Sequence, residues 1–211
     1  MRTDAARPTL TTLPMNYVAP PGRHPHNVID LEFNAAAIAR FNAVLHGIYA
    51  DAARVDAQRF AGLVQWLLDL PPKQARRELR QRLARLADLR KMAADRDWDT
   101  DESQRAHLAR LLEYLDDPED AIPDRTPRLG RLDDALLIEL AWPAFADEVA
   151  DYQDFCRFRA ERHPREKSAP LKRSAWIGMR NTEAAPWRQS LHVRHRPNPD
   201  HGGAAESSLP A

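Results

Sequence analysis

The 211-residue chain is poor in the features that mark secreted, disulfide-bonded and membrane-spanning proteins. Its one cysteine, Cys156, cannot form an internal disulfide, so nothing in the sequence requires an oxidising compartment. No apolar segment follows the initial Met-Arg-Thr-Asp, and no apolar run reaches the roughly 18 residues of a membrane span. The sequence therefore predicts a soluble cytoplasmic protein without an integral membrane span, with a peripheral membrane location as an alternative.

Glycine is also scarce, with seven residues, and β-branched residues are few, whereas alanine, leucine and arginine are abundant. This composition favours helix over strand. Hydrophobic residues make up 43% and charged residues 29% of the chain, which fits a globular core with a polar surface. The length suits one ordinary domain, or one domain with tails.

The common catalytic motifs are missing as well. The chain has no Ser-His-Asp order, glycine-rich phosphate-binding loop, paired-cysteine motif or His-Glu-x-x-His sequence. Cys156 occupies an inward position of a predicted helix, so we interpret it as a buried, inert thiol in preference to a nucleophile. These absences argue against an enzyme, and no cofactor is expected, although a divalent cation remains an alternative.

Apolar residues recur at three- and four-residue steps over six stretches, which predicts an all-α, bundle-like domain of five or six helices over residues 34–163. Asn34 is the expected N-cap of the first helix, and Asp101 with Gln104 resembles a capping box at the fourth. Pro143 is expected to bend or break the chain between the last two helices. The helices are predicted at about 35–50, 55–70, 72–94, 101–115, 133–142 and 143–161.

The two ends of the chain are rich in proline and lack a helical period. Residues 1–33 are predicted to be a mostly disordered leader, in which residues 28–33 are a candidate strap packed on the domain. Residues 164–211 are predicted to be a basic disordered tail.

Charge is unevenly spread although the formal net charge is zero. Residues 73–91 hold eight basic and two acidic residues, residues 97–154 hold five basic and seventeen acidic, and residues 157–196 hold eleven basic and three acidic. An acidic centre thus lies between a basic helix and a basic tail. Such segregation indicates pairing within the chain or selection of charged partners.

The segment from residue 114 to 142 is the most tightly specified part of the sequence. Its order Asp-Pro-x-Asp-x-Ile-Pro-Asp-x-x-Pro-x-x-Gly-x-x-Asp-Asp resembles the signature of the YkvA-like family, mostly bacterial helical proteins of unknown function. With its flanking helices the resemblance covers about residues 70–142; it implies a helical domain and supplies no catalytic residues. The matching residues are Asp117, Pro118, Asp120, Ile122, Pro123, Asp124, Pro127, Gly130, Asp133 and Asp134.

A structural role for this loop is the favoured interpretation. Pro123 and Pro127 would stiffen the connection, and Gly130 would permit a tight turn. Asp133 and Asp134 would lie in the first turn of the following helix, where its positive end favours carboxylates.

A metal site is the alternative, because the stretch from residue 116 to 134 carries seven acidic residues. Carboxylate oxygens at this density suit a hard cation such as Mg²⁺ or Mn²⁺. A metal-dependent, hydrolytic enzyme would then use Asp120, Asp124, Asp133 and Asp134.

The basic helix and tail offer a further alternative. Arg76, Arg77 and Arg80 could bind phosphates of nucleic acid or of an anionic membrane, while a solvated face or docking to the acidic loop is the favoured interpretation. Trp176 and Trp187 lie among arginines in the tail, a pattern that suits binding of nucleic acid, membrane or protein. An unstructured extension without a binding role is the equal alternative. The leading hypothesis for the whole chain is a non-enzymatic interaction or scaffold protein whose partner is another protein.

Overall fold

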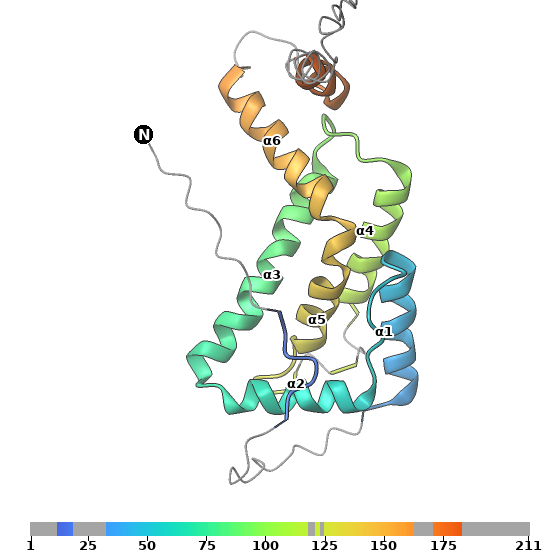
Figure 1. The fold of residues 1–211 in the computed structure, drawn as a ribbon, viewed down its shortest axis with the longest axis vertical. Helices are drawn as coiled ribbons and strands as arrows, with labels where there is room; N and C mark the ends of the chain where they lie inside the picture. The colour runs from blue at the N-terminus through green and yellow to red at the C-terminus, as the bar shows by residue number, and fades with distance from the viewer. Residues whose placement is uncertain (1–11, 19–32, 118–120, 123–124, 163–170, 183–211) are drawn as a thin grey trace, which may run out of the picture.

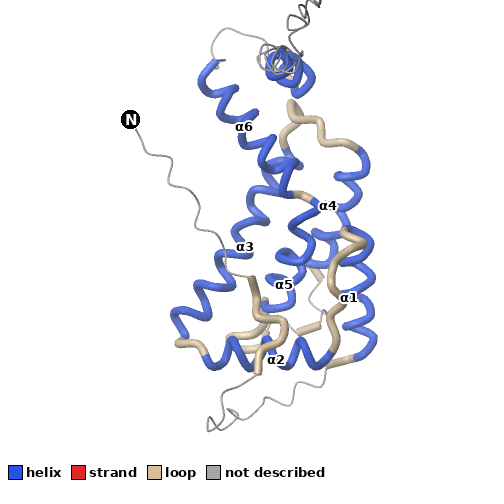
Figure 2. The backbone as a smooth tube through the Cα atoms, viewed as in Figure 1, coloured by secondary structure: helices blue, strands red, loops and turns tan. Residues whose placement is uncertain are grey.

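The computed structural model describes residues 12–18, 33–117, 121–122, 125–162 and 171–182, and every structural statement concerns these residues. The described chain contains helices and turns but no strand, which confirms the all-α prediction (Figures 1 and 2). Residues 173–182 add a further helix after α6. The labelled elements are α1 (Ala35–Ile48), α2 (Ala57–Asp69), α3 (Pro72–Ala94), α4 (Glu102–Leu115), α5 (Leu132–Ala141), the 3₁₀ turn η1 (Trp142–Ala144) and α6 (Ala146–Arg162).

Side-chain caps fix where several helices begin. The Asn34 side chain accepts from the Ala36 N–H at 2.9 Å, as predicted, and the Asp101 side chain accepts from the Gln104 N–H at the same distance. The reciprocal half of the predicted capping box is wrong, because the Gln104 amide instead donates to the Ala144 carbonyl at 3.2 Å. Gln104 therefore ties α4 to η1, the 3₁₀ turn that Pro143 places between α5 and α6.

Helix α5 lies at the centre of the bundle, between α3 on one side and α1 and α4 on the other (Figure 1). Eight of its ten residues are buried, so it has no solvent-facing stripe. A short helix that is apolar all round is stable in water only when other helices cover it. The acidic pair at its start and Glu139 near its end are consequently drawn into the interior.

Arg82 of α3 is one of the largest buried side chains, with 1% of its surface exposed. Its Nε lies 2.5 Å from Glu139 Oε2 in α5, and its Nη1 lies 2.8 Å from Glu78 Oε2 one turn earlier. Arg82 thus differs from the exposed Arg76, Arg77 and Arg80 of the same helix. Because Glu139 interrupts an apolar helix, it needs a cationic partner from α3, and Arg82 is the residue within reach.

Residues 12–18 cross the bundle as a short strap (Figure 1). Leu13 is buried, its N–H donates to Glu139 Oε1 at 2.6 Å, and the Tyr17 hydroxyl donates to Asp69 Oδ2 at 2.7 Å. This part of the predicted leader is thus ordered, because it covers a buried carboxylate and apolar surface. Residues 28–32 of the candidate strap lie outside the described residues, and Phe33 stacks on Phe60 with ring centroids 5.5 Å apart.

Part of the predicted tail is also folded. Residues 173–182 form a helix that packs on residues 148–155 of α6 and on the α3–α4 connection, and Leu171 and Trp176 are buried (Figure 1). Trp176 and Met179 lie three residues apart on one face of this helix, and with Leu171, just before it, they contact the hydrophobic core, which explains why this stretch is ordered. Trp187 and the rest of the tail lie outside the described residues.

Candidate functional site

The signature segment folds as a turn that leads directly into α5. The N–H groups of Leu129 and Gly130 both bond to the Thr126 carbonyl, at 3.2 and 2.9 Å. Leu129 and Gly130 are buried, whereas Pro127 is exposed. The turn therefore fills the end of the bundle with its own residues and is part of the core.

Asp133 is fully buried in the first turn of α5. Its Oδ2 accepts from the Ile122 N–H at 3.0 Å and from the Tyr114 hydroxyl at 3.4 Å. The same hydroxyl accepts from the Ala121 N–H at 3.3 Å. One carboxylate oxygen and one phenol thus hold residues 121–122 against α4 and α5.

The environment of Asp133 favours its neutral form. Burial raises the pKa of this carboxyl to about 6, the Ile122 N–H opposes the rise, and the neighbouring Asp134 charge adds to it. The second oxygen, Oδ1, is buried and has no hydrogen-bond partner among the described groups. A carboxyl that is half protonated near pH 6 and holds two backbone segments suits a structural role.

Asp134 is 1% exposed and pairs with Arg131, whose Nη2 lies 2.9 Å from Asp134 Oδ2. Asp117 pairs with Arg40 of α1 at 2.5 Å, and Asp116 pairs with Arg90 of α3 at 3.1 Å. The predicted docking of the basic helix to the acidic segment is thus present at the Arg90 contact.

Two of the four predicted metal ligands, Asp133 and Asp134, are described, and both are engaged as hydrogen-bond or ion-pair partners of the fold. Asp120 and Asp124 lie outside the described residues, as do Pro118 and Pro123 of the signature. Within the described chain, no group of three or more His, Cys, Asp or Glu side chains has the arrangement of a metal site. The metal hypothesis stays a prediction that depends on Asp120 and Asp124.

Arg128 ties the signature turn to the end of α2. Its Nη2 donates to the carbonyls of Leu68 and Leu70, at 3.3 and 3.2 Å, and its φ of 70° lies in the left-handed region. We expect Arg128→Ala to lose about 1–2 kcal/mol of unfolding free energy, because two carbonyls at the helix end lose a charged donor. Arg128→Gly loses the same bonds but relieves the backbone, so it should be about 1 kcal/mol more stable than the alanine variant. Urea unfolding of both variants checks this order, and an alanine variant as stable as the glycine variant would contradict it.

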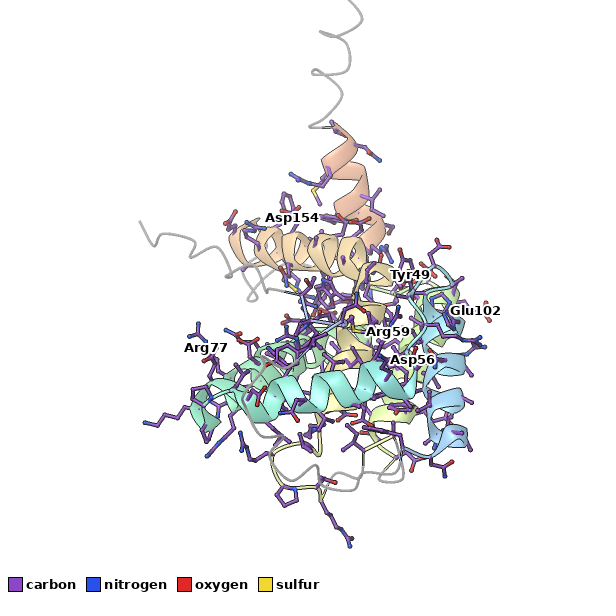
Figure 3. The ribbon with its side chains drawn as sticks, turned by 60° about the horizontal axis from the view of Figure 1, so that its bottom comes forward. Tyr49, Asp56, Arg59, Arg77, Glu102 and Asp154 are labelled. Carbon is purple, nitrogen blue, oxygen red and sulfur yellow. The ribbon has the colours of Figure 1, made fainter. Side chains whose placement is uncertain are left out.

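The N-terminal half of α3 carries an exposed arginine face, formed by Arg76, Arg77 and Arg80. Arg77 points away from the bundle (Figure 3). None of the three makes an ion pair with another described residue. Farther along the helix, by contrast, Arg82 and Arg90 have carboxylate partners, and Arg85 lies over the Trp142 ring at 4.6 Å.

The basic residues in the N-terminal half of α3 lower the stability of this helix. Its N-cap is Pro71, which offers no side-chain cap, and the first turn contains no acidic residue. Arg76 and Arg80 are spaced by four residues on one face of the helix, and two like charges at this spacing are destabilising by a few tenths of a kcal/mol. The arginine face therefore has no stabilising role in the described fold.

The described residues form two clefts that could hold a small molecule. The larger, about 770 Å³, lies between the starts of α1 and α2, where Asp56 caps α2 through the Arg59 N–H and the Arg59 side chain donates to the Arg54 carbonyl (Figure 3). Alanines, Ile38 and Val55 make up most of its remaining lining. The smaller, about 270 Å³, lies at the α3–α4 connection, where Asp95 already pairs with Arg159 at 2.8 Å. Neither cleft brings together an acid, a base and a nucleophile.

Cys156 is half-buried and packs against the core, so it is less enclosed than the sequence predicted. Arg159 Nη2 lies 3.8 Å from its sulfur and also bonds to Asp95. A guanidinium stays protonated and cannot accept a proton, so this contact gives the thiol no base.

In comparisons with known proteins, no protein-family model, curated protein or solved structure matches the chain. The resemblance of residues 117–134 to the YkvA-like signature therefore stays a prediction from those residues alone.

Proposed function

We propose that this protein is a non-enzymatic interaction or scaffold module that binds an acidic protein segment through the arginine face of α3. The observation that carries the proposal is the cluster of three exposed arginines, which form no ion pair with any described residue and include a like-charge pair one turn apart. Local features that cost stability without a structural return are concentrated at functional sites.

An acidic protein fits this face better than a membrane does. The leucine stripe of α3 is packed in the core, so the helix cannot insert an apolar face into lipid without unfolding the bundle. Within the described chain the exposed large hydrophobic residues are Val18 and Ile177, and neither belongs to α3. No described helix combines the length and apolar character that a membrane crossing needs.

An acidic protein also fits better than a nucleic acid. Sequence-tolerant binding of single strands depends on aromatic side chains beside the basic groups, and the N-terminal half of α3 has none. Carboxylates of a partner can instead pair with the guanidinium groups in a bidentate manner.

Charge reversal of Arg76→Glu with Arg80→Glu tests the proposal. We expect this double variant to bind a fluorescein-labelled, glutamate-rich peptide at least tenfold more weakly than the wild type, since two attractive charges become repulsive. Its unfolding free energy should change by less than about 0.5 kcal/mol, because both side chains are exposed. Fluorescence anisotropy and urea unfolding measure the two effects.

Lys91→Glu with Arg96→Glu is the matched control, because it changes the net charge equally at the other end of α3, where both side chains are exposed. This control should retain most of the binding. Equal losses in the two variants would reduce the effect to net charge and refute the arginine face as the site. Binding of an oligonucleotide or of phosphatidylserine vesicles, without binding of the acidic peptide, would assign the face to those ligands instead.

A further inference from the structure

The helix at residues 173–182 rests on a surface that is aromatic at its centre and acidic at its edge. Trp176 lies with its ring centroid 5.5 Å from that of Trp98 and 6.2 Å from that of Phe155. We call the surface formed by Asp97, Trp98, Glu148, Asp154 and Phe155 the α6 docking surface. It is separate from the arginine face and has the opposite charge.

Three ion pairs at the edge hold the helix in place. Lys172 Nζ lies 2.8 Å from Asp97 Oδ1, and Arg173 Nη2 lies 2.8 Å from Glu148 Oε2. Arg180 Nε lies 3.1 Å from Asp154 Oδ2, a charge contact in which that oxygen lacks hydrogen-bond geometry. The surface therefore fits a segment with one aromatic residue. Basic residues lie three and four positions before that aromatic residue, and a third basic residue lies four positions after it.

Arg173 makes the most specific of these contacts. Its guanidinium lies 4.3 Å from the Trp98 ring centroid, and Glu148 bridges it to the Trp98 indole N–H, which donates to Glu148 Oε1 at 3.0 Å. Its backbone N–H donates to the Asp97 carbonyl at 2.9 Å. Arg173 and Glu148 are both largely buried, so this pair is screened less than the exposed contacts of Lys172 and Arg180.

The helix itself is weak. It has ten residues, fewer than an isolated helix needs to be stable in water, and Gly178 lies in its middle. Ile177 is 41% exposed, and the buried indole N–H of Trp176 has no acceptor among the described groups. Its order therefore depends on the docking surface, and its fit to that surface is incomplete.

We propose that the α6 docking surface is a binding site for a basic helix with one aromatic anchor, and that residues 171–182 occupy it as an exchangeable internal ligand. The partner is a protein helix with Lys or Arg three or four residues before a Trp or Phe and a further basic residue one turn after it. Such a helix makes the same ion pairs and aromatic contacts as the internal segment. A Phe anchor also avoids burying an unpaired indole N–H.

A labelled peptide with the sequence of residues 171–182 tests the proposal on the full-length protein. Its apparent affinity depends on the fraction of molecules whose own helix has left the surface. Trp176→Ala in the protein removes the internal anchor, so the peptide should bind this variant at least tenfold more tightly than the wild type. The same peptide with alanine in place of the tryptophan should bind neither protein.

Gly178→Ala in the protein is the opposite variant, because a methyl group at this position meets no atom within 4 Å. Alanine strengthens a helix relative to glycine by about 1 kcal/mol, so the internal helix should stay bound more often and the peptide should bind about fivefold more weakly. A third variant, Lys172→Glu with Arg180→Glu, removes the two exposed ion pairs at the edge of the docking surface without changing a core residue. The peptide should therefore bind this variant more tightly than the wild type. Circular dichroism verifies that each variant is folded.

The predicted order of peptide affinity is Trp176→Ala and the edge variant above wild type, and wild type above Gly178→Ala. Equal affinity for all four proteins would overturn the proposal, and so would absence of binding at millimolar peptide. If Trp176→Ala unfolds the protein, the remaining three proteins still give the order. Because the peptide is basic, neither result bears on the acidic partner of the arginine face.

Discussion

Glu139→Ala is expected to lose about 2–3 kcal/mol of unfolding free energy, because the buried Arg82 loses one of its two carboxylate partners and a charged hydrogen bond contributes about 1.5–3 kcal/mol. The variant leaves the 1%-exposed Arg82 with Glu78 but without the carboxylate of α5, and it removes the acceptor of the Leu13 N–H. Loss of that acceptor should also release residues 12–18 from the bundle. Urea unfolding measures the first effect, and hydrogen exchange of the strap measures the second.

Glu113→Ala is the matched control, because Glu113 is exposed on α4. It should change the unfolding free energy by less than about 0.5 kcal/mol. Arg82→Met combined with Glu139→Leu removes both charges and should recover most of the loss, since apolar residues can replace a buried pair. A Glu139→Ala loss below about 1 kcal/mol would contradict the buried-pair account.

Asp133→Asn is expected to make the protein more stable than the wild type at pH 8 by up to about 3 kcal/mol, and about equal to it near pH 4. Burial raises the pKa of Asp133 to about 6 from 3.8, so between these values the folded protein holds a proton that the unfolded chain has lost. The stabilisation linked to this proton is complete below about pH 3.8 and is lost as the pH rises through about 6. Asparagine is neutral throughout and can still accept from the Ile122 N–H.

Asp151→Asn controls for the loss of a negative charge, because Asp151 is exposed on α6. Urea unfolding of the three proteins at several pH values isolates the Asp133 contribution as a difference. A difference between Asp133→Asn and wild type that does not change with pH would show that this carboxyl has the same pKa in the folded and unfolded states, contrary to the burial argument.

The helices were predictable because local signals agreed with tertiary packing. Asn34 and Asp101 cap helices where the sequence placed caps, and Pro143 separates α5 from α6 through a 3₁₀ turn. The predicted range of about 72–94 for the third helix agrees with α3, in which Leu86 and Leu89 are buried. These features depend on residues within one or two turns of each other, which a sequence pattern records directly.

The interior ion pairs were not predictable in the same way. Arg82 looks like its neighbouring arginines, and only the position of Glu139 across the α3–α5 contact distinguishes it. The one signal in the sequence was Glu139 itself, a charge inside an otherwise apolar helix. The ordered strap at residues 12–18 was missed for the same reason, because its Leu13 is held by a carboxylate 126 positions away.

The signature segment was predictable in part. Its acidic pair falls in the first turn of α5 as predicted, but the helix end does not explain why Asp133 is fully buried. That burial follows from Ile122 and Tyr114, which α4 and the turn bring to the same carboxylate oxygen. The arginine face, by contrast, was predictable from the sequence, and the fold adds that it is exposed and forms no ion pair with the described residues.

The most direct test of the view that the signature turn builds the bundle is a carboxyl ¹³C NMR titration of Asp133 with and without Mg²⁺. The predicted result is a pKa of about 6 in both conditions, because the carboxyl is buried and bonded to the Ile122 N–H. A pKa of Asp133 that falls to 4 or below when Mg²⁺ is added would contradict this view, since it would identify the carboxyl as a metal ligand.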